Sequence, residues 1–341
     1  MGYVSYESGR FFEQMPSAIG PLPLQEFGLR RYEGSLVFEK GIWWIAGTEA
    51  FLQKSSELLS QAETHLIPST STWVGDEEPP QHEFLEAVEE VLARISRGDC
   101  YQVNVARCLK FRPQPALLPL FLRLRKQHPA RFGALLLLDD AGVVSNSPEL
   151  FLRVEGELVE TMPIKGTRPK TPGACEQLRS SEKERAELTM IVDMARNDLA
   201  RCCSAGSVVA EAREVVELPS LYHAQQRVRG RLRRGCDAVD AFAACFPPAS
   251  VTGAPKVKAM EVIRELEPVP RGVYTGAVGY FSDDGNACFS VAIRTLMACS
   301  GEAWLHVGSG IVADSRPEEE LAESGWKAAA FVDALVGKAV G

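Results

Sequence analysis

The chain is organised around the stretch Met162-Pro163-Ile164-Lys165-Gly166-Thr167-Arg168-Pro169-Lys170. Its prolines cannot continue a sheet ladder or a helix interior, and its glycine permits backbone geometry that other residues avoid. The stretch therefore predicts a turn that can point Lys165 into a cleft. Taken alone it also fits a basic surface turn, so the rest of the chain has to decide between the two interpretations.

The composition is that of an ordinary globular protein, with 45% apolar and 24% charged residues over 341 positions, enough for one large or two smaller domains. The net charge of -8 argues against a nucleic-acid partner held by broad phosphate neutralisation. We find no signal peptide, no membrane-spanning apolar run and no CxxC spacing among the cysteines. We therefore expect a cytoplasmic protein with reduced thiols and no membrane partner.

The first part of the chain predicts a strand over 2–7, a hairpin over 35–45 around Lys40-Gly41 and a helix over 48–64. A loop over 68–81, rich in Ser, Thr, Pro and acidic residues, follows. We place the main boundary there. It separates a shortened N-terminal portion with its linker, residues 1–82, from a second and larger portion, residues 83–341.

The second part alternates helices with runs of strands. Helices are expected over 83–98, 116–127, 181–201, 237–245, 256–266 and 318–336, and strands over 101–105, 132–138, 142–154, 208–218, 274–281, 287–299 and 303–307. Glu149 then lies inside one strand and Arg294 in the middle of another. A Ser or Thr cap before Pro255 is expected to open the helix that ends at Leu266. Hairpin runs of strands favour an α+β fold with antiparallel sheets over a regular βαβ alternation.

Two acidic pairs are spaced to share a helix face, Glu184 with Glu187 and Glu320 with Glu323. Four carboxylates brought together would repel one another unless a hard cation such as Mg²⁺ compensated them. The same spacing is common on solvated helices, so each pair alone has a simple structural explanation.

Several other residues are open to two interpretations. Gly308-Ser309-Gly310 fits a dinucleotide pattern only superficially, because no helix is expected to open at Gly310. Thr252 belongs to a segment without P-loop spacing. A strand arginine such as Arg294 needs a carboxylate partner, either structural or from a ligand. His223 and Glu149 fit either a buried structural role or a catalytic one.

Together these stretches closely resemble the chorismate-utilising enzymes, the family of anthranilate synthase component I, aminodeoxychorismate synthase component I and isochorismate synthases. The resemblance covers roughly residues 83–335 and, more weakly, Gly2 to Glu7. It is carried by these segments: Gly98-Asp99-Cys100-Tyr101-Gln102-Val103-Asn104, Ser147-Pro148-Glu149, Pro163-Ile164-Lys165-Gly166-Thr167-Arg168-Pro169, 184–193, Arg196-Asn197-Asp198-Leu199, Thr252-Gly253-Ala254-Pro255-Lys256, Gly276-Ala277-Val278-Gly279-Tyr280, Gly310-Ile311-Val312-Ala313-Asp314-Ser315, and Glu320-Leu321-Ala322-Glu323 with Lys327.

Two positions distinguish the branches of this family. Anthranilate synthases carry alanine where this chain has Lys165, whereas aminodeoxychorismate synthases carry lysine. Isochorismate synthases carry a water-activating lysine where this chain has Gln102, whose amide cannot act as a base. The resemblance therefore implies the aminodeoxychorismate synthase branch. Anthranilate synthesis, or a subunit that binds chorismate or the amidotransferase without turnover, stays open as an alternative.

The resemblance also implies the fold and the roles of individual residues. Two largely antiparallel sheets would form a sandwich surrounded by helices. Lys165 would be the nucleophile and Glu149 the general acid, while Glu184, Glu187, Glu320 and Glu323 would hold Mg²⁺. The residues expected to bind chorismate are Gln102, Thr167, His223, Thr252, Tyr274, Arg294, Gly308, Ser309, Gly310 and Lys327. Ammonia would come from a separate glutamine amidotransferase subunit, and a separate lyase would act on the product.

Overall fold

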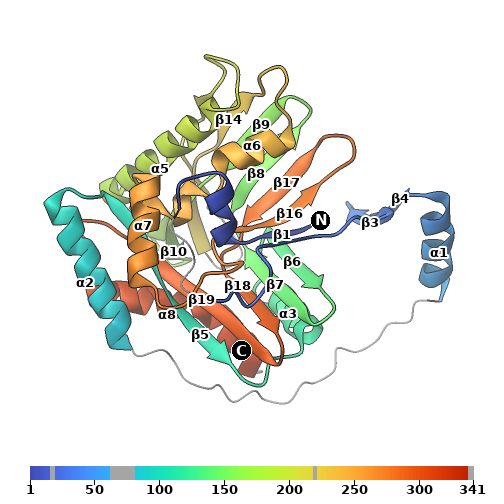
Figure 1. The fold of residues 1–341 in the computed structure, drawn as a ribbon, viewed down its shortest axis with the longest axis horizontal. Helices are drawn as coiled ribbons and strands as arrows, with labels where there is room; N and C mark the ends of the chain where they lie inside the picture. Colours follow the sequence, from blue (N-terminus) through green and yellow to red (C-terminus); the bar gives the residue numbers. More distant parts are fainter. Residues whose placement is uncertain (16–19, 62–80, 218–220, 337–341) are drawn as a thin grey trace.

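The computed structural model describes residues 1–15, 20–61, 81–217 and 221–336. They form the α+β fold that the sequence predicts, and every strand pairing among them is antiparallel. The strands make two large sheets, a three-stranded sheet and a separate hairpin. Figure 1 shows the two large sheets meeting in the middle of the molecule, with helices around them.

The first large sheet has eight strands, and its core lies under two helices, α5 (Glu182–Ala200) and α6 (Ala238–Cys245). Its order is β11 (Val209–Ala210), β14 (Val228–Arg231), β9 (Leu158–Met162), β8 (Leu150–Glu155), β17 (Ala287–Val291), β16 (Ala277–Phe281), β1 (Gly2–Val4) and β2 (Phe27–Leu29). Ser181 caps α5, and Asp237 caps α6 in a capping box with Asp240. The start of the chain is therefore part of the same sheet as β16.

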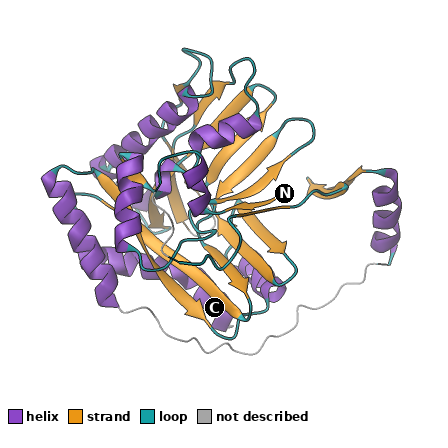
Figure 2. Cartoon of the chain, in the orientation of Figure 1, coloured by secondary structure: helices purple, strands orange, loops and turns teal. Residues whose placement is uncertain are grey.

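The second large sheet has six strands in the order β15 (Gly253–Ala254), β5 (Gln102–Phe111), β19 (Glu302–Ile311), β18 (Thr295–Cys299), β7 (Ala141–Ser147) and β6 (Phe132–Leu137). Helices α3 (Leu117–Gln127) and α8 (Pro317–Val336) share a hydrophobic core with this sheet. Helices α2 (Gln81–Arg97) and α7 (Lys256–Leu266) share another with β5. Figure 2 shows the helices arranged around these strands.

The predicted turn at residues 162–170 is wrong, because most of it forms strand β10 (Ile164–Pro169). β10 is the edge of a three-stranded sheet with β13 (Leu221–Gln225) and β12 (Glu214–Glu217), beside α4 (Ala174–Ser180). Prolines are tolerated at an edge strand and at strand ends. Gly166 has a φ of +78°, and the pairing register shifts between Lys165 and Thr167. The strand therefore carries a bulge at the glycine that suggested a turn.

The N-terminal hairpin and the helix after it are confirmed as β3 (Gly34–Glu39), β4 (Ile42–Gly47) and α1 (Glu49–Ser60). In Figure 1 they stand apart from the two large sheets. Two short 3-10 helices complete the described elements, η1 (Tyr6–Phe11) and η2 (Ala249–Val251). Almost all of the predicted loop 68–81, and the last residues of the predicted helix 48–64, lie outside the described residues. The boundary at residue 82 stays a prediction.

Two long predicted strands are each divided between the two large sheets. Residues 142–154 form β7 and β8, with Pro148 and Glu149 between them, and residues 287–299 form β17 and β18, with Arg294 between them. Pro148 has no N–H for a ladder, and Arg294 has a φ of +49°. The predicted strand 208–218 is likewise divided into β11 and β12. The chain thus passes from one large sheet to the other at both Glu149 and Arg294.

Two further predictions need correction. The N-cap of α7 is Pro255, and no side chain caps this helix, because the Thr252 hydroxyl donates instead to the carbonyls of Pro248 and Ala249. Tyr274 precedes β16 and lies in a turn.

Arg271 is fully buried and ties several segments together. Its guanidinium donates to both carboxylate oxygens of Glu267, to the Thr275 hydroxyl and to the Asn104 and Val251 carbonyls. These bonds join the end of α7 to β5 and to the turn that holds Tyr274. Among the described residues, no helix has the length and apolarity needed to cross a membrane. All nine cysteines are free thiols, as expected.

Candidate active site

Glu149 and Arg294 lie where the chain crosses between the two large sheets, and backbone hydrogen bonds hold these crossings together. The Val291 amide donates to the Glu149 carbonyl at 3.1 Å, and the Asn146 amide donates to the Arg294 carbonyl at 2.9 Å. The carboxyl of Glu149 is buried, and this burial raises its pKa to about 7. Hydrogen bonds from Ser250 and the Ile164 backbone, and the charges of Lys165 and Arg294, limit this rise.

Lys165 points into the same region from the bulge of β10. Its Nζ lies 3.2 Å from where a Cβ on Gly310 would stand, and the Gln102 amide nitrogen lies 2.7 Å from the same point. Burial lowers the pKa of Lys165, although the charges of Glu187 and Glu149 oppose this shift. A desolvated lysine with a lowered pKa supplies the neutral amine that a nucleophile requires.

Thr167 and His223 are joined across the pairing of β10 with β13. The Thr167 hydroxyl lies 2.7 Å from Nδ1 of His223. Burial and the nearby Arg294 charge lower the pKa of His223 to about 4. The imidazole is therefore neutral at ordinary pH, and it offers a hydrogen-bonding nitrogen without a positive charge.

Several polar atoms around Lys165 are buried and have no hydrogen-bond partner among the described residues. They are Nε2 and Oε1 of Gln102, Nδ2 of Asn104, Nε2 of His223 and Oγ of Ser309. A buried polar atom without a partner is costly, and a polar ligand would remove that cost. The arrangement is therefore typical of a binding site for a molecule that carries several oxygen atoms.

Gly308, Ser309 and Gly310 belong to strand β19, which lies beside α8. No helix opens at Gly310, so the prediction that this segment is not a dinucleotide motif is confirmed. Lys327 on α8 donates to the Gly308 carbonyl at 2.8 Å and pairs with Glu323 at 2.6 Å. Gly310 has no side chain to separate its backbone from Gln102 and Lys165. The contact of Lys327 with Gly308 and the contacts at Gly310 therefore lie two residues apart on the same strand.

Tyr274 and Thr252 are also buried, Tyr274 in the turn before β16 and Thr252 directly after η2. The Tyr274 ring stacks on His306 at 5.5 Å and lies under the Arg271 guanidinium. Burial raises the pKa of Tyr274 to about 12, so its hydroxyl stays protonated. Among the described residues no hydrogen bond joins Tyr274 to Arg294. Their pairing on one ligand carboxylate stays a prediction.

The predicted metal ligands come from two helices whose carboxylates interact. Burial raises the pKa of Glu184 and Glu187, and repulsion from Glu323 and Glu320, respectively, adds to this effect. In the described parts of the chain, no three acidic, His or Cys side chains converge closely enough to hold a metal. Half-buried like charges that face each other between α5 and α8 nevertheless fit a hard divalent cation by their chemistry.

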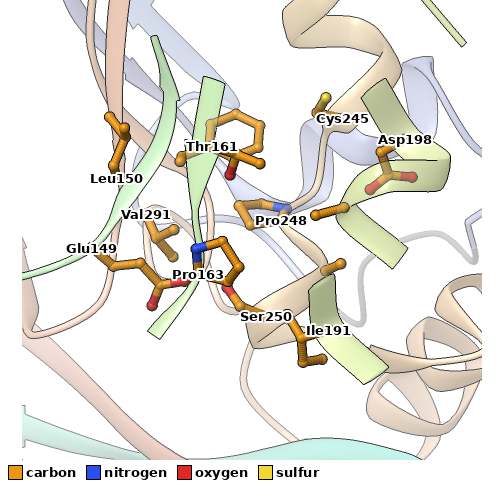
Figure 3. Close-up of a pocket in the computed structure, with 13 residues that line it drawn as sticks. Glu149, Leu150, Thr161, Pro163, Ile191, Asp198, Cys245, Pro248, Ser250 and Val291 are labelled. Carbon is orange, nitrogen blue, oxygen red and sulfur yellow. The ribbon is translucent and has the colours of Figure 1, made fainter. Parts of the chain in front are cut away.

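A small internal cavity lies behind Glu149. It measures about 20 Å³, which is room for about one water molecule, and Glu149, Thr161, Asp198, Cys245 and Ser250 contribute to its lining. Figure 3 shows Glu149 and Ser250 on one side of Pro248, with Asp198 and Cys245 on the other.

The sequence interpretation missed two residues of this region as site residues. Ser250 belongs to the stretch that is predicted to open a helix, whereas in the structure it lies in η2 and lines the small cavity beside Glu149. Asn104 enters the sequence analysis only as part of a motif, although it lies two residues from Gln102 on the same strand and the nitrogen of its buried amide has no partner among the described residues. Two polar residues on the buried face of a strand were the signal that could have identified Asn104.

The comparison with known families decides the relationship. The family described as chorismate binding enzyme matches residues 1–333. The chain belongs to this family. The match also covers the N-terminal residues, where the resemblance in the sequence motifs was weak. This chorismate-binding enzyme shares 38% identity with anthranilate synthase component 1 of Methanothermobacter thermautotrophicus, over 98% of this chain and 74% of the relative.

Relatives named aminodeoxychorismate synthase have nearly the same sequence identity to this chain. Aminodeoxychorismate synthase component 1 of Escherichia coli is 35% identical over 95% of this chain and 74% of its own. Among solved structures, anthranilate synthase component I from Streptococcus pneumoniae has a TM-score of 0.87 at 28% identity, covering 97% of this chain and 80% of that one. The chain is thus a chorismate-utilising enzyme of α+β fold, and identity does not separate the two branches.

Proposed function

We propose that this chorismate-binding enzyme is an aminodeoxychorismate synthase component I, which aminates chorismate at C4. The observation that carries the proposal is a desolvated lysine, Lys165, beside a buried acid, Glu149, in one site with unpartnered polar atoms. The lowered pKa of Lys165 favours a neutral amine, and the raised pKa of Glu149 favours a protonated carboxyl. These are the two forms that the amination requires.

In the proposed reaction, the Lys165 amine forms a C–N bond at C2 of the ring while the double bonds shift and the C4–O bond breaks. Glu149 gives its proton to the departing hydroxyl, which leaves as water. Ammonia then bonds to C4, the double bonds shift back, and the C2–N bond to Lys165 breaks. The amine therefore ends at C4, para to the ring carboxylate. Without the lysine, ammonia would attack C2 itself and give the ortho amine.

The remaining residues would hold the substrate dianion. Arg294 and Tyr274 would bind the enolpyruvyl carboxylate, and the Gly308 to Gly310 backbone with Lys327 the ring carboxylate. His223, Thr167, Thr252 and Gln102 would contact the ring substituents. Glu187 and Glu323, assisted by Glu184 and Glu320, would hold Mg²⁺. When bound, this ion neutralises the ring carboxylate and the charge that builds toward it.

The partners and pathway are part of the same proposal. The relatives are named as first components, which supports a second subunit, and we assign to it the release of ammonia from glutamine. A lyase would then remove pyruvate on the way to p-aminobenzoate and folate. We place these reactions in the cytoplasm.

Anthranilate synthase component I is the second candidate, favoured by the names of several relatives. Incubation with chorismate, Mg²⁺ and ammonium, with or without added aminodeoxychorismate lyase, separates the two. We expect p-aminobenzoate only after the lyase is added; anthranilate without the lyase would contradict the proposal. Chorismate binding without any consumption would indicate a silent subunit.

Lys165→Ala tests the nucleophile directly. We expect para amination to be lost, with at most a trace of the ortho product. Mass spectrometry of wild-type enzyme quenched with chorismate, in the absence of ammonia, is expected to find an adduct on Lys165. Lys170→Ala is the matched control, because Lys170 lies on the same stretch but pairs with Glu217 on the exposed side. An adduct elsewhere would remove the assignment of Lys165.

A further inference from the structure

A large hollow lies along β5, past the two residues of this strand that pair with β15. Its volume is about 890 Å³, and it is bounded by α2, β5, β19 and the end of α7 with the segment that follows. Six of its lining residues are more than nine-tenths buried: Phe84, Ala87, Ala106, Cys108, Glu267 and His306. We call these six residues the floor of the hollow. The proposed reaction uses none of them.

The floor carries no unmatched charge. Glu267 pairs with Arg271 at 2.5 Å. Burial raises the pKa of the Cys108 thiol to about 12 and lowers the pKa of His306 to about 3, so both side chains are neutral at ordinary pH. A charged group that entered this part of the hollow would lose its hydration without gaining a counter-charge. The floor therefore favours an uncharged ligand.

The entrance of the hollow is unfavourable to anions in particular. Among the exposed lining residues, three carry a carboxylate, Glu83, Glu86 and Glu265, and one, Lys110, carries an ammonium group. A carboxylate that approached the hollow would meet more like charge than opposite charge. The charges at the entrance and the neutral floor thus select against the same class of ligand.

His306 offers the floor's unused polar atoms. The Pro270 backbone is near enough to act on its pKa, yet neither ring nitrogen has a hydrogen-bond partner among the described residues. One face of the ring stacks on Tyr274, with centroids 5.5 Å apart and planes 15° apart. The stacking leaves the two nitrogens at the ring edge. A neutral imidazole donates at one nitrogen and accepts at the other, and a hydroxyl group can meet either requirement.

We propose that this hollow binds an uncharged aromatic molecule with a hydroxyl group, whose hydroxyl bonds to the edge of the His306 ring. The aromatic body would pack against Phe84, Ala87 and the Cys108 sulfur, contacts that suit an aromatic ring. Because His306 stacks on Tyr274, we also expect occupation of the hollow to change the affinity for chorismate. This coupling rests on the proposed function, which assigns Tyr274 to the substrate, whereas binding in the hollow does not.

Phenol, toluene and benzoate are the probes, because they share a ring and differ in the group that would meet His306. Ligand-observed NMR titrations of the full chain measure their dissociation constants. We expect phenol to bind about tenfold more tightly than toluene, the effect of one hydrogen bond to a buried neutral group, and benzoate to bind more weakly than both. Phenol is also expected to shift the ¹⁵N resonances of the His306 ring saturably in labelled protein.

His306→Phe keeps a ring for the stacking on Tyr274 and removes both nitrogens. It is expected to abolish the preference for phenol over toluene. If this variant does not fold, His306→Gln assigns the ¹⁵N resonances of the wild-type ring, and the phenol titration of wild type decides. His82→Phe is the matched control, because His82 is exposed on the first turn of α2 and does not line the hollow. It is expected to retain the preference.

Unchanged His306 resonances at saturating phenol, or equal phenol affinity in wild type and a folded His306→Phe, would overturn the site. Calorimetry in the absence of ammonia tests the coupling. Phenol is expected to change the dissociation constant of chorismate by at least about threefold, and chorismate to change that of phenol by the same factor. Phenol binding that leaves chorismate binding unchanged would overturn the coupling. A protein that binds no chorismate would overturn the proposed function, and the phenol titrations would still decide the site.

Discussion

The Thr167 hydroxyl and Nδ1 of His223 lie 2.7 Å apart across the pairing of β10 with β13. Thr167 follows the bulge at Gly166, so this contact links the bulge that carries Lys165 to the neighbouring strand. The pKa of His223 is lowered to about 4 by burial and by Arg294. The ring is therefore oriented by a neutral hydrogen bond, and its Nε2 is left without a partner among the described residues.

Thr167→Val is expected to lower kcat/KM for chorismate by about tenfold, the effect of losing one hydrogen bond that orients a site residue. Thr167→Ser keeps the hydroxyl and is expected to retain most of the activity. Steady-state kinetics at saturating ammonium measures both variants. Thr189→Val, on an exposed turn of α5, is the control. Equal activity of the valine and serine variants at position 167 would remove this role.

Glu149→Gln is expected to stabilise the protein at alkaline pH. Because the folded protein raises the pKa of Glu149 from 4.5 to about 7, it binds this proton more tightly than the unfolded chain does. The stabilisation is complete below pH 4.5 and is lost as the pH rises through 7, by up to about 3 kcal/mol. Glutamine cannot ionise, so the variant avoids this loss.

Urea unfolding at pH 5 and pH 8 checks the prediction. The variant is expected to gain in free energy of unfolding relative to wild type between the two values. Glu155 is exposed at the end of β8, the strand that begins directly after Glu149, and Glu155→Gln is expected to show no such gain. A wild-type advantage at pH 8 would contradict the raised pKa of Glu149.

The sequence predicted the parts of the fold that local patterning determines. The apolar spacing of α2 and the Lys40-Gly41 hairpin are local signals, and both elements are confirmed. Strand breaks were not predicted, because a chain that leaves one sheet for another stays extended and apolar. At Arg294 the break depends on one positive φ, which the residue type does not announce.

The candidate site was predicted less from pattern than from resemblance. The residues themselves indicated a lysine in a constrained stretch and two acidic pairs, and the structure brings Lys165, Glu149, Gln102 and Gly310 together. Ser250 could not be found in this way, since a serine near the start of a predicted helix also fits a capping role. Only the place of Ser250 in the folded chain, in the lining of the small cavity beside Glu149, distinguishes the two roles.

Arg271→Met is expected to destabilise the fold by about 3–5 kcal/mol, because it leaves the Glu267 carboxylate buried without its cation. The double variant Arg271→Met with Glu267→Gln is expected to lose clearly less, since no charge is then left unpaired. Denaturant unfolding measures both. Arg316→Met removes an exposed pair with Glu319 and is expected to cost at most about 1 kcal/mol. Equal losses in the single and double variants would contradict this account.

Glu187→Ala is expected to weaken the dependence of turnover on Mg²⁺ by more than about tenfold, or to abolish turnover. The carboxylate interacts with Glu184, Glu320 and Lys165, so its removal also withdraws a charge that favours protonated Lys165. A Mg²⁺ titration of chorismate consumption measures the effect, and isothermal titration calorimetry with Mg²⁺ measures binding without turnover. Glu182→Ala, exposed on the first turn of α5, is the control. If the Mg²⁺ titration of Glu187→Ala is the same as that of wild type, Glu187 is excluded as a ligand.

Gly310→Ala separates the packing of the site from the stability of the fold. A Cβ at this position would stand 2.7 Å from the Gln102 amide nitrogen and 3.2 Å from the Lys165 amine, so one or both side chains must move. We expect at least a tenfold fall in kcat, because displacement of a reacting group by a fraction of an ångström is costly to catalysis.

Gly325→Ala is the matched control for that substitution. Gly325 lies within α8, and a Cβ there would meet no atom within 4 Å. Alanine is expected to stabilise this helix by roughly 0.5–1 kcal/mol and to leave turnover unchanged. Circular dichroism and thermal unfolding would show that both variants fold, and kinetics with chorismate and ammonium would compare them. Full activity in Gly310→Ala would mean that Lys165 and Gln102 need not lie against this glycine, and the contact at Gly310 would lose its role in presenting the amine.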